Sequence, residues 1–178
     1  MELHISKLDA AKRQLETAIN LFFRGGDPIA IHTLAGAAFQ ILNDIGEKQK
    51  IKSVHGQLLD WVKPEKKDEV FKAINAAKNF FKHADKDPDG IIKFNFGATE
   101  YYMMDSTRMY LLLTKHNVPL FRLFDVYFAS KYPDTILQGN IQGAVNQAIS
   151  LSGVDPNNPQ SFLKLLPTIE EALLNLNL

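Results

Sequence analysis

The strongest fold signal in the sequence is DPIAIHTLAGAAFQILNDI, Asp27 to Ile45. It begins with an Asp-Pro pair, in which Asp27 suits the N-cap of a helix and Pro28 its first position. In the helix that follows, Pro28 to about Ile45, few positions are polar and small residues are frequent. A helix that is apolar nearly all round is surrounded by other helices. The stretch therefore predicts a central helix that its neighbours approach closely.

Helical patterns continue on both sides of this stretch. Upstream, Ser6 begins an amphipathic run with Asp9 three residues later, as in a capping box, and Gly25-Gly26 ends it. Downstream, we expect helices at Ser53 to Val62, Pro64 to Ala84, Thr99 to Lys115, 120–132, 135–151, 159–166 and 167–175. The segment IIKFNF, Ile91 to Phe96, has strand-like content but no evident strand to pair with. The sequence thus predicts an all-α protein, a single helical bundle of seven to eight helices forming one domain over residues 1–178.

Bulk composition excludes several classes of protein. With 46% hydrophobic and 22% charged residues in a chain of 178, the sequence is typical of one globular domain. Lys+Arg and Asp+Glu are both 20, and this zero net charge argues against a chain that coats nucleic acid, although a local basic patch stays open. The absence of cysteine excludes disulfides, zinc–thiolate sites and thiol nucleophiles.

No segment of the sequence suggests a membrane. The N-terminus, MELHISKLDA, lacks the basic segment and apolar run of a signal peptide. The most apolar stretch, VPLFRLFDVYFA, is too short to span a bilayer and carries Arg122 and Asp125. We therefore expect a cytoplasmic protein with no membrane partner.

One short motif points to a function. The segment KNFFKH, Lys78 to His83, resembles the Arg-Asn-x-x-x-His form of the motif found in the HEPN superfamily, with Lys78 in place of the arginine and Asn79 and His83 at the other two positions. The resemblance implies an all-α bundle in which motif residues of two subunits meet in a cleft, and in many members a metal-independent ribonuclease. It thus implies a homodimer that binds RNA or a nucleotide, with Lys78, Asn79 and His83 as catalytic residues. A lysine holds phosphate as a point charge without the planar fork of arginine, so whether the chain cleaves RNA or only binds it stays open.

The residues themselves allow this chemistry without requiring it. Asn79 and His83 are four residues apart and share one face of the expected helix, which should point away from Val70, Ile74 and Phe81, with Lys78 next to that face. Cleavage of RNA at its 2′-hydroxyl needs a base, an acid and a phosphate clamp, which two copies of His83 with Lys78 would supply. The same residues equally suit the solvated face of an ordinary amphipathic helix. In that case the protein is a non-catalytic helical module for interaction or oligomerisation.

The motif is followed by DKDPDG, which resembles the first half of a calcium loop. Asp85, Asp87 and Asp89 occupy the first three ligand positions, but Phe96 stands where such a loop needs a bidentate glutamate. The other interpretation is a solvated acidic turn.

Two further features have alternative interpretations. His32, on the apolar helix, either pairs with His83 or Asp85 in a ligand site or is a buried histidine with a plain hydrogen bond. The stretch TEYYMMDSTRMY, Thr99 to Tyr110, suits either a partner groove or core on one face of a helix. Because no His-x3-His or Glu-x2-His spacing occurs, we expect no metal and no cofactor.

Overall fold

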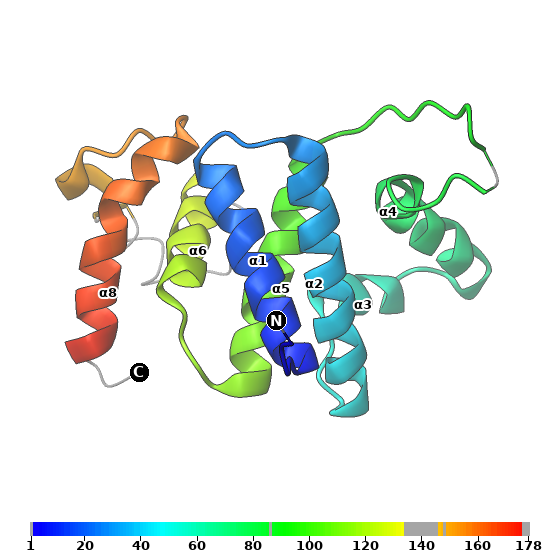
Figure 1. Ribbon diagram of the computed structural model, residues 1–178, viewed down its shortest axis with the longest axis horizontal. Helices are drawn as coiled ribbons and strands as arrows, with labels where there is room; N and C mark the ends of the chain where they lie inside the picture. The colour runs from blue at the N-terminus through cyan, green and yellow to red at the C-terminus, as the bar shows by residue number, and fades with distance from the viewer. Residues whose placement is uncertain (1, 86, 134–145, 148, 176–178) are drawn as a thin grey trace.

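The computed structural model describes residues 2–85, 87–133, 146–147 and 149–175. Within these ranges no strand occurs, which confirms the all-α prediction. The elements are α1 (Lys7–Phe23), α2 (Pro28–Lys48), α3 (Val54–Asp60), the 3-10 helix η1 (Pro64–Lys66), α4 (Lys67–Phe80), α5 (Gly97–Thr114), α6 (Pro119–Lys131), the 3-10 helix η2 (Pro159–Leu165) and α8 (Leu166–Asn175) (Figure 1).

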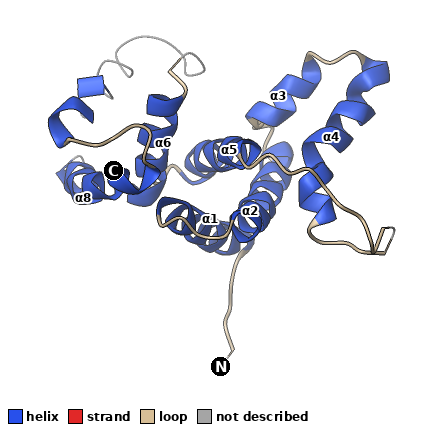
Figure 2. Cartoon of the chain, turned by 90° about the horizontal axis from the view of Figure 1, so that it is seen from above, coloured by secondary structure: helices blue, strands red, loops and turns tan. Residues whose placement is uncertain are grey.

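Helix α2 is central, as its composition predicted. It packs against α1 and α5 and also contacts α4 (Figures 1 and 2). Its start is fixed as expected, because Asp27 Oδ1 accepts a hydrogen bond of 2.8 Å from the Ala30 N–H and Pro28 occupies the first turn. The buried residues of α2 are Ile31, His32, Ala35, Gly36, Ala38, Phe39, Leu42 and Gly46.

The main core lies between α1, α2, α5 and α6. At one end of it, Phe22 and Phe23 of α1 meet Phe124 and Tyr127 of α6, with edge-to-face ring contacts of 5.1–6.2 Å between centroids. Phe162 of η2 is fully buried beside this cluster and brings the C-terminal part of the chain onto α6. Such edge contacts add to the free energy of burying the rings.

Helices α3 and α4 stand to one side of this core. They pack on each other, and with η1 and the segment up to Phe96 they form what we call the α3–α4 lobe, residues 53–96 (Figure 2). No residue of α3 is fully buried, and in α4 only Asn75 and Lys78 are. All three residues of the predicted motif lie in this lobe.

One expectation about the elements is wrong, and another lies mostly outside the described residues. Helix α4 ends at Phe80, not at Ala84, because Phe81 turns inward onto His32 and Phe94 and the chain leaves the helix. Residues 91–96 form no strand, since no neighbouring segment offers an edge. The helix expected over 135–151 lies mostly outside the described residues. Among the described helices, none combines the length and apolar composition that crossing a bilayer requires.

Candidate functional site

The predicted motif lies where α4 ends and the chain turns. The Lys82 and His83 N–H groups both donate to the Asn79 carbonyl oxygen, at 3.1 Å each, so His83 is still held one turn from Asn79 although it lies beyond the helix. The turn is anchored from inside: the Phe81 ring packs edge-on against the His32 ring, with centroids 5.6 Å apart. The ring of Phe94, further along the chain, contacts the same His32 ring, with centroids 4.9 Å apart. Aromatic packing on α2 therefore fixes the direction of the whole segment.

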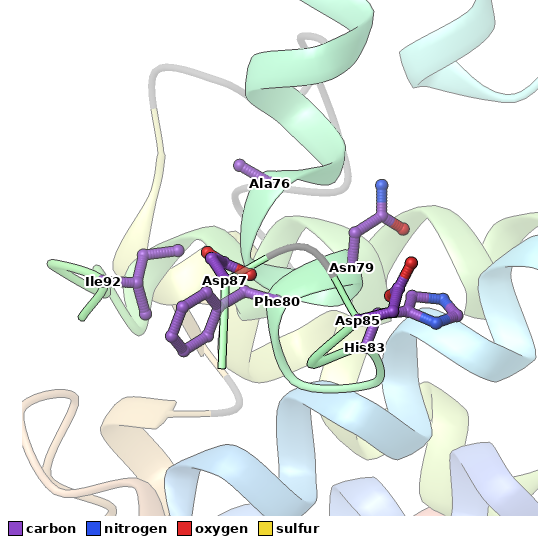
Figure 3. A pocket seen from close by; sticks show the side chains of 7 residues that line it. All are labelled: Ala76, Asn79, Phe80, His83, Asp85, Asp87 and Ile92. Atoms are coloured by element: carbon purple, nitrogen blue, oxygen red, sulfur yellow. The ribbon is translucent and has the colours of Figure 1, made fainter. Parts of the chain in front are cut away.

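An open cavity of about 740 Å³ lies between the end of α4 and the chain that follows it, up to Ile92 (Figure 3). Asn79 and His83 both line it, and both side chains are exposed. The remaining lining residues are Ala76, Phe80, Asp85, Asp87 and Ile92. Hydrogen-bonding groups and an aromatic ring thus face a space large enough for a nucleotide-sized ligand.

Lys78 is not part of this cavity. The prediction that it lies next to the outward face of α4 is wrong: its side chain is 5% exposed and its stem lies over Gly36 of α2. Its Nζ donates a hydrogen bond of 2.8 Å to Gln40 Oε1, and Gln40 Nε2 donates in turn to Asp44 Oδ1. Gly36 leaves room for this stem, because a Cβ there would lie 3.1 Å from Lys78 Cγ and Cδ.

The surroundings of Lys78 also change its electrostatics. Burial lowers the pKa of its ammonium group, Lys82 lowers it further, and Asp44 opposes the shift. The structure therefore brings together two of the three motif residues, Asn79 and His83, and directs the third into the protein. The long aliphatic stem of lysine makes this possible, since it packs on an apolar surface while the ammonium reaches a polar partner.

The acidic segment from Asp85 to Gly90 contains a hydrogen-bonded turn. Gly90 N–H donates to the Asp87 carbonyl oxygen at 2.9 Å, and the Asp87 side chain lies so close to Gly90 that a Cβ there would be 2.6 Å from Asp87 Oδ2. Asp85 and Asp87 face the cavity, whereas Asp89 is exposed and does not line it. Among the residues that the structure describes, no group of three or more His, Cys, Asp or Glu is arranged to hold a metal ion.

His32 is a buried histidine with a plain hydrogen bond, and it pairs with neither His83 nor Asp85. Its Nδ1 lies 2.9 Å from Thr99 Oγ1 of α5, and its side chain is almost fully buried between Phe81, Phe94 and Tyr102. Its Nε2 has no hydrogen-bond partner in the described structure. Burial, together with the nearby positive charges of Lys78 and Lys82, lowers the pKa of His32 to about 4.

A buried carboxylate that attaches the α3–α4 lobe was not predicted. Asp105 of α5 is fully buried and accepts hydrogen bonds from the N–H groups of Val54 and His55, at 2.9 and 3.0 Å. These are the first two residues of α3. It also lies 2.8 Å from His55 Nδ1, and the His55 ring stacks on Tyr102. Ser53, the N-cap that the sequence does reveal, accepts from Gly56 N–H and donates to Asn43 Oδ1 of α2.

The sequence indicates the helix that carries Asp105, but it does not indicate the role of Asp105 itself. The stretch Thr99 to Tyr110 was open to two interpretations, and it is core: Tyr102, Met103 and Met109 are buried. Asp105 itself carries no local sign that it caps a helix fifty residues earlier, because its partners are set by the packing of α3 on α5.

Charge is divided unevenly along the sequence. Residues 48–93 contain 11 of the 20 Lys and Arg residues but only 7 of the 20 Asp and Glu residues. This segment therefore has a formal charge of +4, and the remainder of the chain −4. The zero net charge thus conceals a basic segment of the chain, and the residues that line the candidate cavity lie within this segment.

No protein-family model, curated protein or solved structure matches this chain significantly.

Proposed function

We propose that this protein is a cytoplasmic, HEPN-like RNA-binding protein that acts as a homodimer and binds single-stranded RNA at the cavity beside α4. The observation that carries the proposal is the position of Asn79 and His83, two residues of the motif, which line one open cavity in the basic part of the chain. Single-stranded RNA presents phosphates, sugar hydroxyls and unstacked bases, and each class of group has a matching residue type here.

The lining of the cavity favours a sugar or a base over a phosphate. The carboxylates of Asp85 and Asp87 repel phosphate but accept hydrogen bonds from ribose hydroxyls and from the amino groups of bases. Asn79 offers both a donor and an acceptor, and Phe80 offers a ring face for stacking. Phosphates then lie outside the cavity, where Lys82 and Lys93, both exposed and adjacent in the chain to lining residues, supply positive charge.

The position of Lys78 favours binding over cleavage by one subunit alone. The resemblance assigns this position to a phosphate clamp, yet its Nζ is engaged with Gln40 behind the cavity wall. His83 is exposed and available as a base, so cleavage requires that a second subunit bring an acid to it. A cation other than Lys78 must then hold the phosphate, because Gln40 engages Lys78 in each copy. Ribonuclease activity therefore depends on the dimer, whereas binding does not.

The test is RNA binding by matched variants. Fluorescence anisotropy with a labelled single-stranded oligonucleotide should show that His83→Ala and Asn79→Ala each weaken binding about 5- to 10-fold, since each removes one or two hydrogen bonds. Lys82→Ala should lower the slope of log K against log salt by about 0.7, the value for one phosphate contact on a single strand. His116→Ala and Lys115→Ala, at exposed positions after α5, serve as controls and should change neither quantity. The proposal is wrong if the wild-type protein binds no RNA or if all variants bind alike.

The second candidate is a non-catalytic interaction or oligomerisation module. It is favoured by the exposure of apolar side chains on helices that bury little, such as Leu58 of α3 and Leu174 of α8, which are 51% and 77% exposed. This candidate predicts a concentration-dependent oligomer in sedimentation experiments that neither RNA nor the His83→Ala change affects. Dissociation of the oligomer by His83→Ala would instead place His83 at the subunit contact that the RNA proposal requires.

A further inference from the structure

The only tryptophan of the chain is exposed to solvent. Trp61 follows α3 as its C-cap residue; its N–H is bonded to the Leu58 carbonyl oxygen, and its side chain is 89% exposed. Four other large apolar residues of the lobe, Val54, Leu58, Phe71 and Ile91, are 37%, 51%, 55% and 98% exposed. Trp is highly buried on average in folded proteins, so this exposed indole is free to contact a ligand.

Of the nine charged residues from Lys52 to Lys72, four form ion pairs within the described part of the chain and five do not. Lys52 Nζ forms an ion pair with Asp60 Oδ2 at 2.6 Å, and Lys66 Nζ forms one with Glu69 Oε2 at 2.7 Å. Lys63, Lys67 and Lys72 have no ion pair among the described residues, and they face two unpaired carboxylates nearby in the chain, Glu65 and Asp68. The local balance is thus slightly basic, within a segment, 48–93, whose formal charge is +4.

We infer that Trp61 is a stacking site for the bases of single-stranded RNA, with the lysines of the lobe neutralising the phosphates on either side. This inference rests on the proposed function and adds a second contact to it, away from the cavity that Asn79 and His83 line. An exposed ring in a basic segment suits a base and its phosphates, because each base has an exposed π-face in a single strand and none in a duplex. An acidic amphipathic protein segment would instead require a continuous apolar groove beside the ring.

Intrinsic fluorescence tests the inference directly, because all tryptophan emission of the protein comes from Trp61. Titration with an oligoadenylate of about ten nucleotides should quench this emission along the same binding curve that anisotropy gives. Inorganic polyphosphate, which has the charge but no bases, should leave the emission intensity unchanged. Trp61→Ala should weaken RNA binding about 5- to 100-fold, and Trp61→Phe should restore part of the loss. Leu174→Ala removes a comparably exposed apolar side chain on α8 and should have no effect.

The outcomes separate this inference from the function on which it rests. If RNA binds in a His83-dependent manner while Trp61 emission and the affinity of Trp61→Ala stay unchanged, the stacking site is wrong and the proposed function stands. If no RNA binds at all, the proposed function fails and the inference fails with it. A blue shift of the emission with an acidic amphipathic peptide, but no response to oligoadenylate, would overturn the inference in favour of a protein partner. Unchanged melting of Trp61→Ala would show that each result reflects binding and not folding.

Discussion

Asp105→Ala is expected to lower the free energy of unfolding by about 3 kcal/mol, because it removes three hydrogen bonds from a carboxylate that is fully buried. The two backbone donors at the start of α3 would be left without a partner in a place that water reaches poorly. His55 would lose the group that lies 2.8 Å from its Nδ1. Chemical denaturation of wild type and variant at neutral pH measures the difference.

The loss should begin in the α3–α4 lobe. No residue of α3 is fully buried, so Asp105 supplies much of what holds this helix to α5. Hydrogen exchange should therefore show that the Val54 and His55 amides lose protection, while the amides of α1 and α2 keep theirs. Asp89→Ala, at an exposed carboxylate, is the matched control and should change stability by less than about 0.5 kcal/mol. Equal stability of Asp105→Ala and wild type would show that the hydrogen bonds to Asp105 are not what attaches the lobe.

Stability is also expected to fall by about 3 kcal/mol on acidification because of His32 alone. Its pKa is about 4 in the folded protein, where burial and then Lys78 and Lys82 disfavour the charged ring, against 6.5 in the unfolded chain. Between these values the unfolded chain binds more protons than the folded protein, so the free energy of unfolding decreases as the pH falls. The stabilisation is complete above pH 6.5 and is lost as the pH approaches 4. The 2.5-unit difference corresponds to about 3 kcal/mol.

A double variant isolates this effect from the other acid-sensitive groups. His32→Leu/Thr99→Val removes the ring and its hydrogen-bond partner together, so that no polar atom of the pair is left buried alone. Urea unfolding between pH 7 and pH 4.5 should show the free energy of unfolding of the wild type falling relative to that of the variant as the pH falls, because only the wild type contains His32. Parallel curves would show that His32 does not titrate in the way that its burial requires.

The sequence predicted those features that depend on neighbouring residues. The spacing of apolar residues identified α2 as the central helix, and the predicted caps at Ser6 and Asp27 are both present. Asn79 and His83 were also placed together correctly, because their four-residue spacing fixes them relative to each other whether or not the helix continues. Each of these features is settled within a few residues of chain.

Tertiary packing alone determined which way three of the polar side chains point. Lys78 turns inward because Gly36 leaves space and Gln40 an acceptor, 38 positions away from it. His32 finds Thr99 across 67 positions, and Asp105 finds the start of α3 across about 50. A buried polar group must find a partner wherever the packing provides one, and the spacing of apolar residues along a helix does not reveal that partner.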